Sequence, residues 1–145
     1  MIARLLHILE HLAKQNGVVI EASLNANGIC VPATDATLSE IMFNLIRNAI
    51  EASQSEPVGK VRIETKSTQE MVVLTVADNG PGIDPVVLQS LYKPFVTGKP
   101  TGTGLGLYVA SERVRELHGK LLCDSKSGRG TIFRIELPVC KPNVT

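Results

Sequence analysis

One long helix, over about residues 35–53, constrains the fold of this chain more than any other feature. Its apolar residues recur at intervals of three and four, which is typical of a helix with one face against a hydrophobic core; they are Leu38, Ile41, Met42, Leu45, Ile46 and Ala49. Beside them runs a polar stripe of Glu40, Asn44, Asn48 and Glu51. A solvated surface is the plain interpretation of such a stripe. Asparagine, however, is a mediocre helix former whose amide oxygen is a good ligand for a hard cation such as Mg²⁺.

The other segments predict a mixture of helices and strands. Further helices are expected over 2–15, near 85–92 and over 105–118, and strands over 18–24, 28–31, 60–67, 71–77, 120–125 and 131–138. The pairs 18–24 with 28–31 and 120–125 with 131–138 are joined by short turns, and the continuous apolar run 71–77 predicts a strand buried on both faces. This order favours an α+β two-layer sandwich, with a mixed, mainly antiparallel sheet packed against helices, over a doubly wound parallel sheet.

Composition limits the class of protein. The chain has 145 residues, which fits a single domain over 1–145, and 43% of them are hydrophobic and 20% charged. The net charge of +1 gives no reason to expect binding to nucleic acid or to a membrane surface. The 3 cysteines lie far apart, which predicts reduced thiols. No signal peptide or membrane-spanning run is evident, so we expect a cytoplasmic protein or the cytosolic piece of something larger.

The segment VADNGPGI, residues 76–83, leads from a buried strand into a glycine-containing turn. Gly80 and Gly82 allow a tight turn that can approach a ligand closely. The Asp78 carboxylate at the mouth of this turn accepts hydrogen bonds and donates none. It can therefore bind the amino group of adenine, whereas guanine would present an acceptor to an acceptor. An Asx turn that merely ends the strand is the plain alternative.

The segment KPFVTGKPTGTGLGL, residues 93–107, contains glycines just before a helix. Free backbone N–H groups and the helix dipole at Gly102, Gly104 and Gly106 would favour phosphate, and Lys93 and Lys99 can add positive charge. The spacing fits neither the dinucleotide-binding fingerprint nor the P-loop, because no strand leads into the glycines and no lysine follows the last one.

A fourth segment, SGRGTIFRIEL over residues 127–137, reads most simply as a hairpin turn at Gly128 and Gly130. Thr131, at the start of the following strand, could lean into a site at that end of the sheet.

Together and in this order, these segments resemble the ATP-binding catalytic domain of sensor histidine kinases. That domain belongs to the superfamily of gyrase, heat-shock chaperone and mismatch-repair ATPases, which have the Bergerat-type ATP-binding fold. NLIRNAIEA is similar to the N box, DNGPGI to the G1 box, KPFVTGK to the F box, GTGLGL to the G2 box and GRGTIF to the G3 box. The resemblance covers about residues 25–138.

The resemblance implies ATP and Mg²⁺ as cofactors. Asn48 would hold Mg²⁺ with Asn44 beside it, and Asp78 would bind adenine with support from Thr131 through water. Lys99 would reach the terminal phosphate, which makes Asn44 and Lys99 the expected catalytic residues. The remaining expected nucleotide-binding residues are Gly80, Gly82, Ile83, Lys93, Phe95, Gly102, Thr103, Gly104, Leu105, Gly106 and Leu107, with Phe95 as the anchor of a mobile lid.

Glu51 departs from the family pattern, because many members carry lysine or arginine there to meet the phosphates. That charge would fall to Lys99, to Arg47 or Lys93, and to the metal. With PF-x-T-x-K, Glu51 resembles the nitrogen- and oxygen-sensor branch of histidine kinases.

Phosphoryl transfer is favoured over hydrolysis, because hydrolysing relatives have a glutamate where this chain has Asn44, and an amide cannot act as a general base. None of His7, His11 and His118 has the surroundings of a phosphoacceptor. We therefore expect an excised domain, monomeric by itself, whose partners are a histidine-bearing dimerisation domain of the same full-length protein and, through it, a response regulator.

Three alternatives stay open from the residues alone. One is a serine protein kinase of the anti-sigma type, and another is a nucleotide-binding interaction module that transfers no phosphate. The third is a zinc site, because His7, Glu10 and His11 match the H-x-x-E-H pattern of some peptidases, although no third ligand is evident.

Overall fold

Helices and strands alternate along the chain in the computed structural model, which describes residues 2–25, 31–89, 105–126 and 128–140. The helices are α1 (Ile2–Gln15), α2 (Asp35–Ser53), α3 (Pro85–Leu88) and α4 (Leu105–Glu116). The strands are β1 (Val18–Leu24), β2 (Gly59–Ser67), β3 (Met71–Asp78), β4 (Lys120–Lys126) and β5 (Gly130–Pro138).

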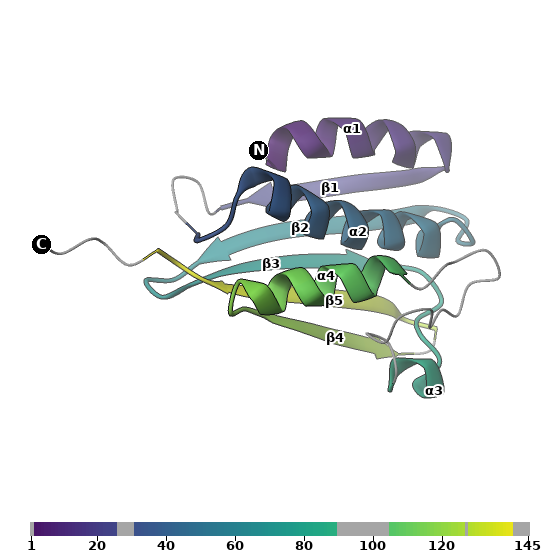
Figure 1. Cartoon of the computed structure of the whole chain (residues 1–145). Coiled ribbons are helices and arrows are strands. Elements are labelled where there is room, and N and C mark those ends of the chain that lie inside the picture. Colours follow the sequence, from purple (N-terminus) through teal and green to yellow (C-terminus); the bar gives the residue numbers. More distant parts are fainter. Residues whose placement is uncertain (1, 26–30, 90–104, 127, 141–145) are drawn as a thin grey trace, which may run out of the picture.

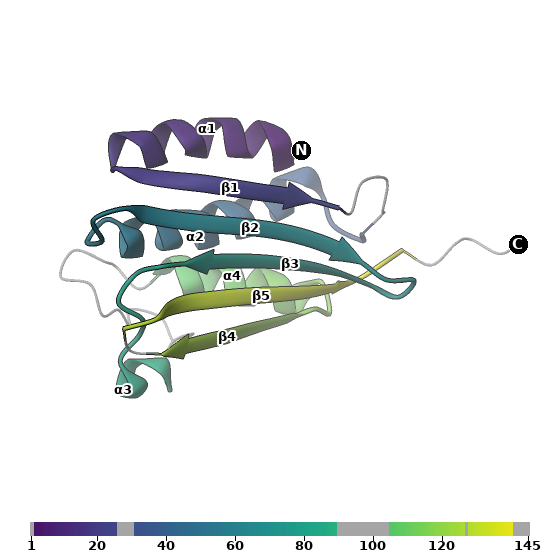
Figure 2. The ribbon, with the colours of Figure 1, turned by 180° about the vertical axis from the view of Figure 1, so that it is seen from behind.

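The five strands form one sheet in the order β1-β2-β3-β5-β4. β1 runs parallel to β2, and the other neighbours are antiparallel. The helices α1, α2 and α4 lie on one face of this sheet, and the view from behind shows the other face open (Figures 1 and 2). The predicted two-layer sandwich with a mixed, mainly antiparallel sheet is therefore confirmed.

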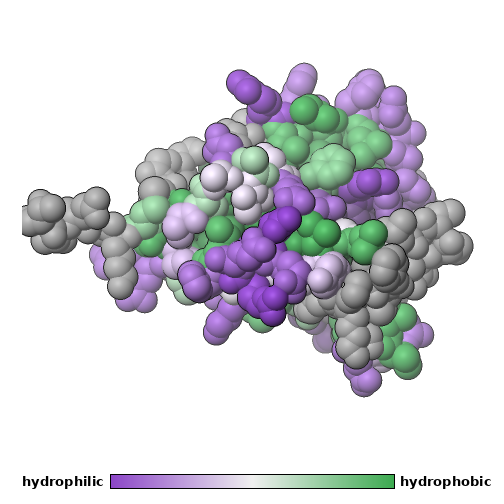
Figure 3. Space-filling view, in the orientation of Figure 1, coloured by the Kyte–Doolittle hydropathy of each residue, from purple (hydrophilic) through white to green (hydrophobic). Residues whose placement is uncertain are grey.

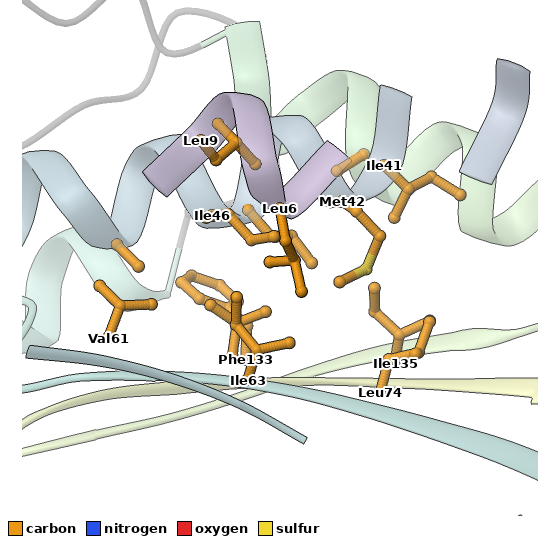
Figure 4. Close-up of a cluster of buried hydrophobic side chains, with 14 of the residues drawn as sticks. Leu6, Leu9, Ile41, Met42, Ile46, Val61, Ile63, Leu74, Phe133 and Ile135 are labelled. Carbon is orange, nitrogen blue, oxygen red and sulfur yellow. The ribbon is translucent and has the colours of Figure 1, made fainter. Parts of the chain in front are cut away.

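The core lies between the helices and the covered face of the sheet. Ile46 of α2 points toward Phe133 and Ile63 of the sheet, and Met42 of α2 points toward Ile135 and Leu74 (Figure 4). Each of these six side chains is at most 3% exposed. The apolar stripe predicted for α2 is thus the face that packs on the sheet. Burial of side chains of this size contributes roughly 1.5–3 kcal/mol each.

The sequence placed the bounds of α2 well, because its ends carry clear local signals. Thr34 precedes the helix as its N-cap, and its hydroxyl oxygen accepts a hydrogen bond from the Thr37 backbone N–H at 3.1 Å. The helix ends at Ser53, with Gln54 as its C-cap, just before the segment SEPVG. The last helix is shorter than predicted, since α4 ends at Glu116 and His118 adopts a left-handed φ of 60°.

Two expectations from the sequence are wrong, and a third falls mostly outside the described residues. β3 is buried on one face only: among the described residues, the helices α1, α2 and α4 all pack on that face, and Val73, Thr75 and Ala77 on the other face are half-buried. For the expected strand 28–31, residues 28–30 lie outside the described residues, and Val31 is not in a strand. Cys140 is disulfide-bonded, so the expectation of reduced thiols is wrong for this residue.

The surface of the helical face is mixed, with strongly hydrophilic side chains gathered over α4 (Figure 3). Over the part of the chain that the structure describes, no helix is both long and apolar enough to span a bilayer.

Candidate functional site

One stripe of α2 faces two loops that are far apart in the sequence. A Cβ atom on Gly106, at the start of α4, would lie 3.3 Å from the Asn44 Oδ1 atom, and one on Gly80, after β3, would lie 2.5 Å from the Ala52 carbonyl oxygen. Asn44, Asn48 and Ala52 are spaced four residues apart and therefore follow one another on the same side of the helix. Asn48 thus lies along α2 between the positions that meet the two loops.

The Asn44 side chain is held in one orientation. Its Nδ2 atom donates a hydrogen bond to the Glu40 carbonyl oxygen at 2.9 Å. The Oδ1 atom is consequently the one directed toward Gly106 and the N-terminus of α4. Two half-buried asparagines on this stripe provide amide oxygens, the type of ligand that hard cations prefer.

Asp78 ends β3 beside two hydroxyl groups. Strand register places Asp78 opposite Thr131 of β5, and Thr131 opposite Ser125 of β4. Asp78 is 8% exposed and Thr131 is 4% exposed, both on the helix-covered face. The Asp78 Oδ1 atom accepts a hydrogen bond from the Gly80 N–H at 2.9 Å. The Asx turn is therefore present. A carboxylate can accept roughly four hydrogen bonds, and the turn uses one of them.

The turn after Asp78 is fastened to the β4–β5 hairpin. The Gly128 N–H donates to the Pro81 carbonyl oxygen at 2.7 Å, and the Ile83 N–H donates to the Ser125 Oγ atom at 2.8 Å. Gly130 has a φ of 86°, and a Cβ atom there would collide with the Asp78 carbonyl oxygen. Only glycine allows this approach of two backbones, which explains why the hairpin glycines belong to the site.

Two further residues position this loop, and sequence reasoning gave neither a role. The Asn79 Oδ1 atom accepts from the Lys60 N–H at 2.8 Å, and its Nδ2 atom donates to the Val58 carbonyl oxygen at 2.8 Å. Asn79 thereby ties the start of β2 to the end of β3. Ser125 binds the Ile83 amide from β4. A DNG turn was a usable signal for Asn79, whereas the role of Ser125 depends on a strand register that local sequence does not reveal.

Ion pairs, rather than a ligand, occupy part of the polar stripe. Arg113 of α4 contacts Glu40 of α2 at 3.1 Å (Nε to Oε2) and Glu116 at 3.0 Å (Nη1 to Oε1). The hydrogen bonds that Arg113 donates to Glu116 and then to Glu40 raise the pKa of Arg113 above its ordinary value. Arg47 pairs with Glu51 at 3.2 Å on the outer side of α2. Glu40 therefore helps to hold α4 against α2.

The structure brings together only part of the predicted set. The end of β3, the start of β5, the C-terminal half of α2 and the start of α4 lie at the same end of the molecule (Figure 1). By chain position these segments carry the predicted residues Asn44, Asn48, Asp78, Gly80, Gly82, Ile83, Leu105, Gly106, Leu107 and Thr131. The predicted residues Lys93, Phe95, Lys99, Gly102, Thr103 and Gly104 lie outside the described residues. Within the described ranges, no group of three His, Cys, Asp or Glu side chains is placed to hold a metal ion.

Comparison with known proteins shows which sequences and structures this chain is similar to. The family model described as "Histidine kinase-, DNA gyrase B-, and HSP90-like ATPase" matches residues 33–141. Sporulation kinase A of Bacillus subtilis (strain 168) is 35% identical over 131 residues, which are 90% of this chain and 21% of that protein. Sensor histidine kinase ZraS of Salmonella typhimurium is 31% identical over 140 residues, 96% of this chain and 30% of that protein.

A solved structure shows the same fold over nearly the whole chain. The mycobacterial sensor histidine kinase MprB superposes with a TM-score of 0.82 at 25% identity, covering 95% of this chain and 91% of that one. The two curated relatives are much longer, since this chain spans only 21% and 30% of their lengths.

Proposed function

This chain belongs to the family of histidine kinase-, DNA gyrase B- and HSP90-like ATPases, and from that premise we propose that it binds Mg²⁺-ATP and donates the γ-phosphoryl group to a histidine on a separate dimerisation domain. The observation that carries this proposal is the position of Asn44 beside the start of α4 and of Asn48 one turn further along α2, toward the loop after Asp78. A nucleotide bound with its base at Asp78 and its phosphates at α4 would extend along this stripe.

Adenine recognition is assigned to the end of β3. Asp78 is nearly buried and accepts hydrogen bonds, so it suits the amino group of adenine. The contacts of Gly80 and Gly130 leave no room for side chains beside this carboxylate. Thr131, directly opposite Asp78 on β5, would support the base through water.

Phosphate and metal binding are assigned to α2 and the start of α4. Asn48 would hold Mg²⁺ through its amide oxygen, with Asn44 beside it; Mg²⁺ commonly uses one or two protein ligands together with phosphate oxygens and water, so this donor set fits. When bound, the ion would neutralise charge on the phosphates. Leu105, Gly106 and Leu107 form the first turn of a helix of 12 residues whose N-terminus favours anions. From the sequence pattern we add Lys99 at the terminal phosphate.

Transfer, rather than hydrolysis, follows from Asn44. Its Nδ2 atom donates to the Glu40 carbonyl oxygen, and an amide takes no proton from water. A neutral imidazole needs no such base, because a ring nitrogen already carries a lone pair at neutral pH. That nitrogen would bond to the γ-phosphorus as the bond to the ADP oxygen breaks. The work of this chain is then positioning and charge neutralisation.

The partners and setting follow from the same proposal. The phosphoacceptor histidine would belong to the dimerisation domain of the same full-length sensor, and the phosphoryl group would pass to a response regulator in two-component signalling. We place the domain in the cytoplasm, where ATP is available, and propose that it is monomeric by itself.

A transfer assay in trans tests the proposal. The chain is incubated with Mg²⁺, γ-labelled ATP and the histidine-bearing domain of the same full-length protein. We expect label on that domain that is lost in acid and kept in base, and no label when EDTA is added or in Asp78→Asn. Asp124→Asn, the same change at an exposed position of β4, should transfer like wild type. Acid-stable label would instead indicate a serine acceptor, and ADP release without label would contradict transfer.

A further inference from the structure

Ser125 lies at the centre of a hydrogen-bonded group at the edge of the proposed adenine site. Its Oγ atom accepts from the Ile83 N–H at 2.8 Å and lies 3.2 Å from the Gly130 carbonyl oxygen and 2.9 Å from the Thr131 Oγ1 atom. These partners come from two other segments, the turn after β3 and the start of β5. Ser125 is therefore the point at which the loop and the two strands meet.

Counting protons fixes the direction of these hydrogen bonds. A serine hydroxyl has one proton to donate and two lone pairs to accept with. If Ser125 donates to the Gly130 carbonyl oxygen, its lone pairs accept from the Ile83 N–H and the Thr131 O–H, and all three contacts are satisfied. If it donates to Thr131 instead, the contact with the Gly130 carbonyl oxygen is lost. The first arrangement is therefore favoured in a part-buried group.

This arrangement decides what Thr131 can offer to a ligand. With its only proton directed at Ser125, the Thr131 hydroxyl presents lone pairs alone. Asp78, directly opposite on β3, presents a carboxylate. These two side chains therefore present only hydrogen-bond acceptors to a ligand. An adenine amino group supplies donors to them, directly or through water, whereas the carbonyl oxygen that hypoxanthine and guanine carry at the same ring position does not.

We propose that Ser125 is a positioning residue which orients the Thr131 hydroxyl and so sets the preference of the site for a 6-amino over a 6-oxo purine. This inference rests on the proposed ATP binding. It assigns base selectivity to a residue of β4 that need not touch the nucleotide. Removing the Ser125 hydroxyl releases the Thr131 proton, which can then be donated to a 6-oxo group.

Calorimetric titration with ATP and with inosine triphosphate tests this assignment, because the two bases differ only at the 6-position and the adjoining ring nitrogen. We expect wild type to prefer ATP and Ser125→Ala to lower that preference by about tenfold, the equivalent of one hydrogen bond. Ser125→Thr retains the hydroxyl and should retain the preference. Thr65→Val removes another buried hydroxyl, which accepts from the Asn25 N–H at 2.9 Å far from the site, and should leave the preference unchanged.

Other outcomes distinguish the role of Ser125 from the proposed binding of ATP. Loss of the Ile83 partner weakens both nucleotides alike, so an equal weakening, or no change, in Ser125→Ala overturns the role of Ser125 while ATP binding stands. If wild type binds neither nucleotide, the proposed function fails and the inference fails with it. If Ser125→Ala does not fold, as judged by circular dichroism, Ser125→Cys provides the same comparison with a much weaker hydrogen-bonding group, and an unchanged preference there overturns the proposal.

Discussion

At the scale of single residues, the site depends on polar groups that strand register brings into one row. Asp78 is far in the sequence from Thr131 and Ser125, yet the three are consecutive partners across β3, β5 and β4. Opposite residues in antiparallel strands have Cβ atoms roughly 4.5–5.5 Å apart. A carboxylate and two hydroxyl groups are thereby concentrated at one end of a sheet whose interior is apolar.

Cys123, two residues before Ser125 on the same face of β4, gives a pH-dependent prediction. Burial, followed by the charges of Asp124 and Asp78, raises its pKa from 9.0 to about 12. The folded state therefore keeps a proton that the unfolded state loses between these values. Its contribution to stability is complete below about pH 9 and is lost as the pH rises toward 12.

The measurement is the free energy of unfolding in urea at pH 8 and at about pH 10.5. We expect wild type to lose about 1 kcal/mol more than Cys123→Ser between these conditions, a value reduced because the thiol is only half-buried. The serine variant cannot titrate there and controls for all other groups. Parallel losses in the two proteins would contradict the raised pKa.

Sequence alone could identify a functional residue where its neighbours in the chain indicate its role. Asp78 stands between an apolar strand and two glycines, and Thr131 follows a glycine hairpin, so both were candidates. The DNG turn was a local signal for Asn79, but its hydrogen-bond partner lies 19 positions away, and the partner of Ser125 lies 42 positions away. Such contacts follow from strand register and loop path, which no local pattern specifies.

At the scale of elements, the relation of α2 to α4 matters most for the site. α2 carries the asparagines, and α4 lies beside it with its N-terminal residue Gly106 against Asn44 and its later residue Arg113 paired with Glu40. The two contacts are about two turns apart on α4. They fix the helix along its length and aim its N-terminus at the polar stripe.

The substitution Gly106→Ala should change the free energy of unfolding and the affinity for Mg²⁺-ATP in different ways. Alanine is the better helix former by about 1 kcal/mol, but its Cβ atom would lie 3.3 Å from the Asn44 Oδ1 atom and would displace that amide. We expect an unchanged or higher free energy of unfolding, and an affinity for Mg²⁺-ATP about tenfold lower.

Denaturant titration and calorimetry on the same preparations measure the two effects. Ser111→Ala is the matched control, because Ser111 lies on the same helix. Its hydroxyl donates a hydrogen bond to the Tyr108 carbonyl oxygen of that helix at 3.0 Å. It should leave nucleotide affinity as in wild type. An unchanged affinity in Gly106→Ala would argue against a role for the Asn44 amide in binding.

Prediction of the elements succeeded or failed for identifiable reasons. α2 carries both a cap and a uniform apolar stripe, so its bounds were found. β3 is apolar on both faces, which suggested double burial, but all of α1, α2 and α4 pack on one side. The parallel pairing of β1 with β2 requires α2 as the crossover, a long-range relation that periodicity does not contain.

At the scale of the whole molecule, the core that stabilises the fold and the candidate site lie in different parts of the domain. One face of the sheet is covered by helices, and the other carries exposed charges such as the pair of Arg62 and Glu21 at 3.5 Å. The candidate site lies on the helix-covered face, at the end of the sheet where β3 ends and β5 begins. Loops can therefore shape the site while the core between helices and sheet stays intact.

The most direct test of the account is calorimetric titration of ATP, with GTP in parallel, into the wild-type chain and Asp78→Asn in the presence of Mg²⁺. The account predicts ATP binding in the micromolar range, about −8 kcal/mol at 1 μM, with much weaker binding of GTP. Loss of the charged acceptor in Asp78→Asn should weaken ATP by roughly ten- to a hundredfold, and Asp124→Asn should bind like wild type. Equal ATP affinity in wild type and Asp78→Asn, or no binding by a folded wild-type chain, would contradict it.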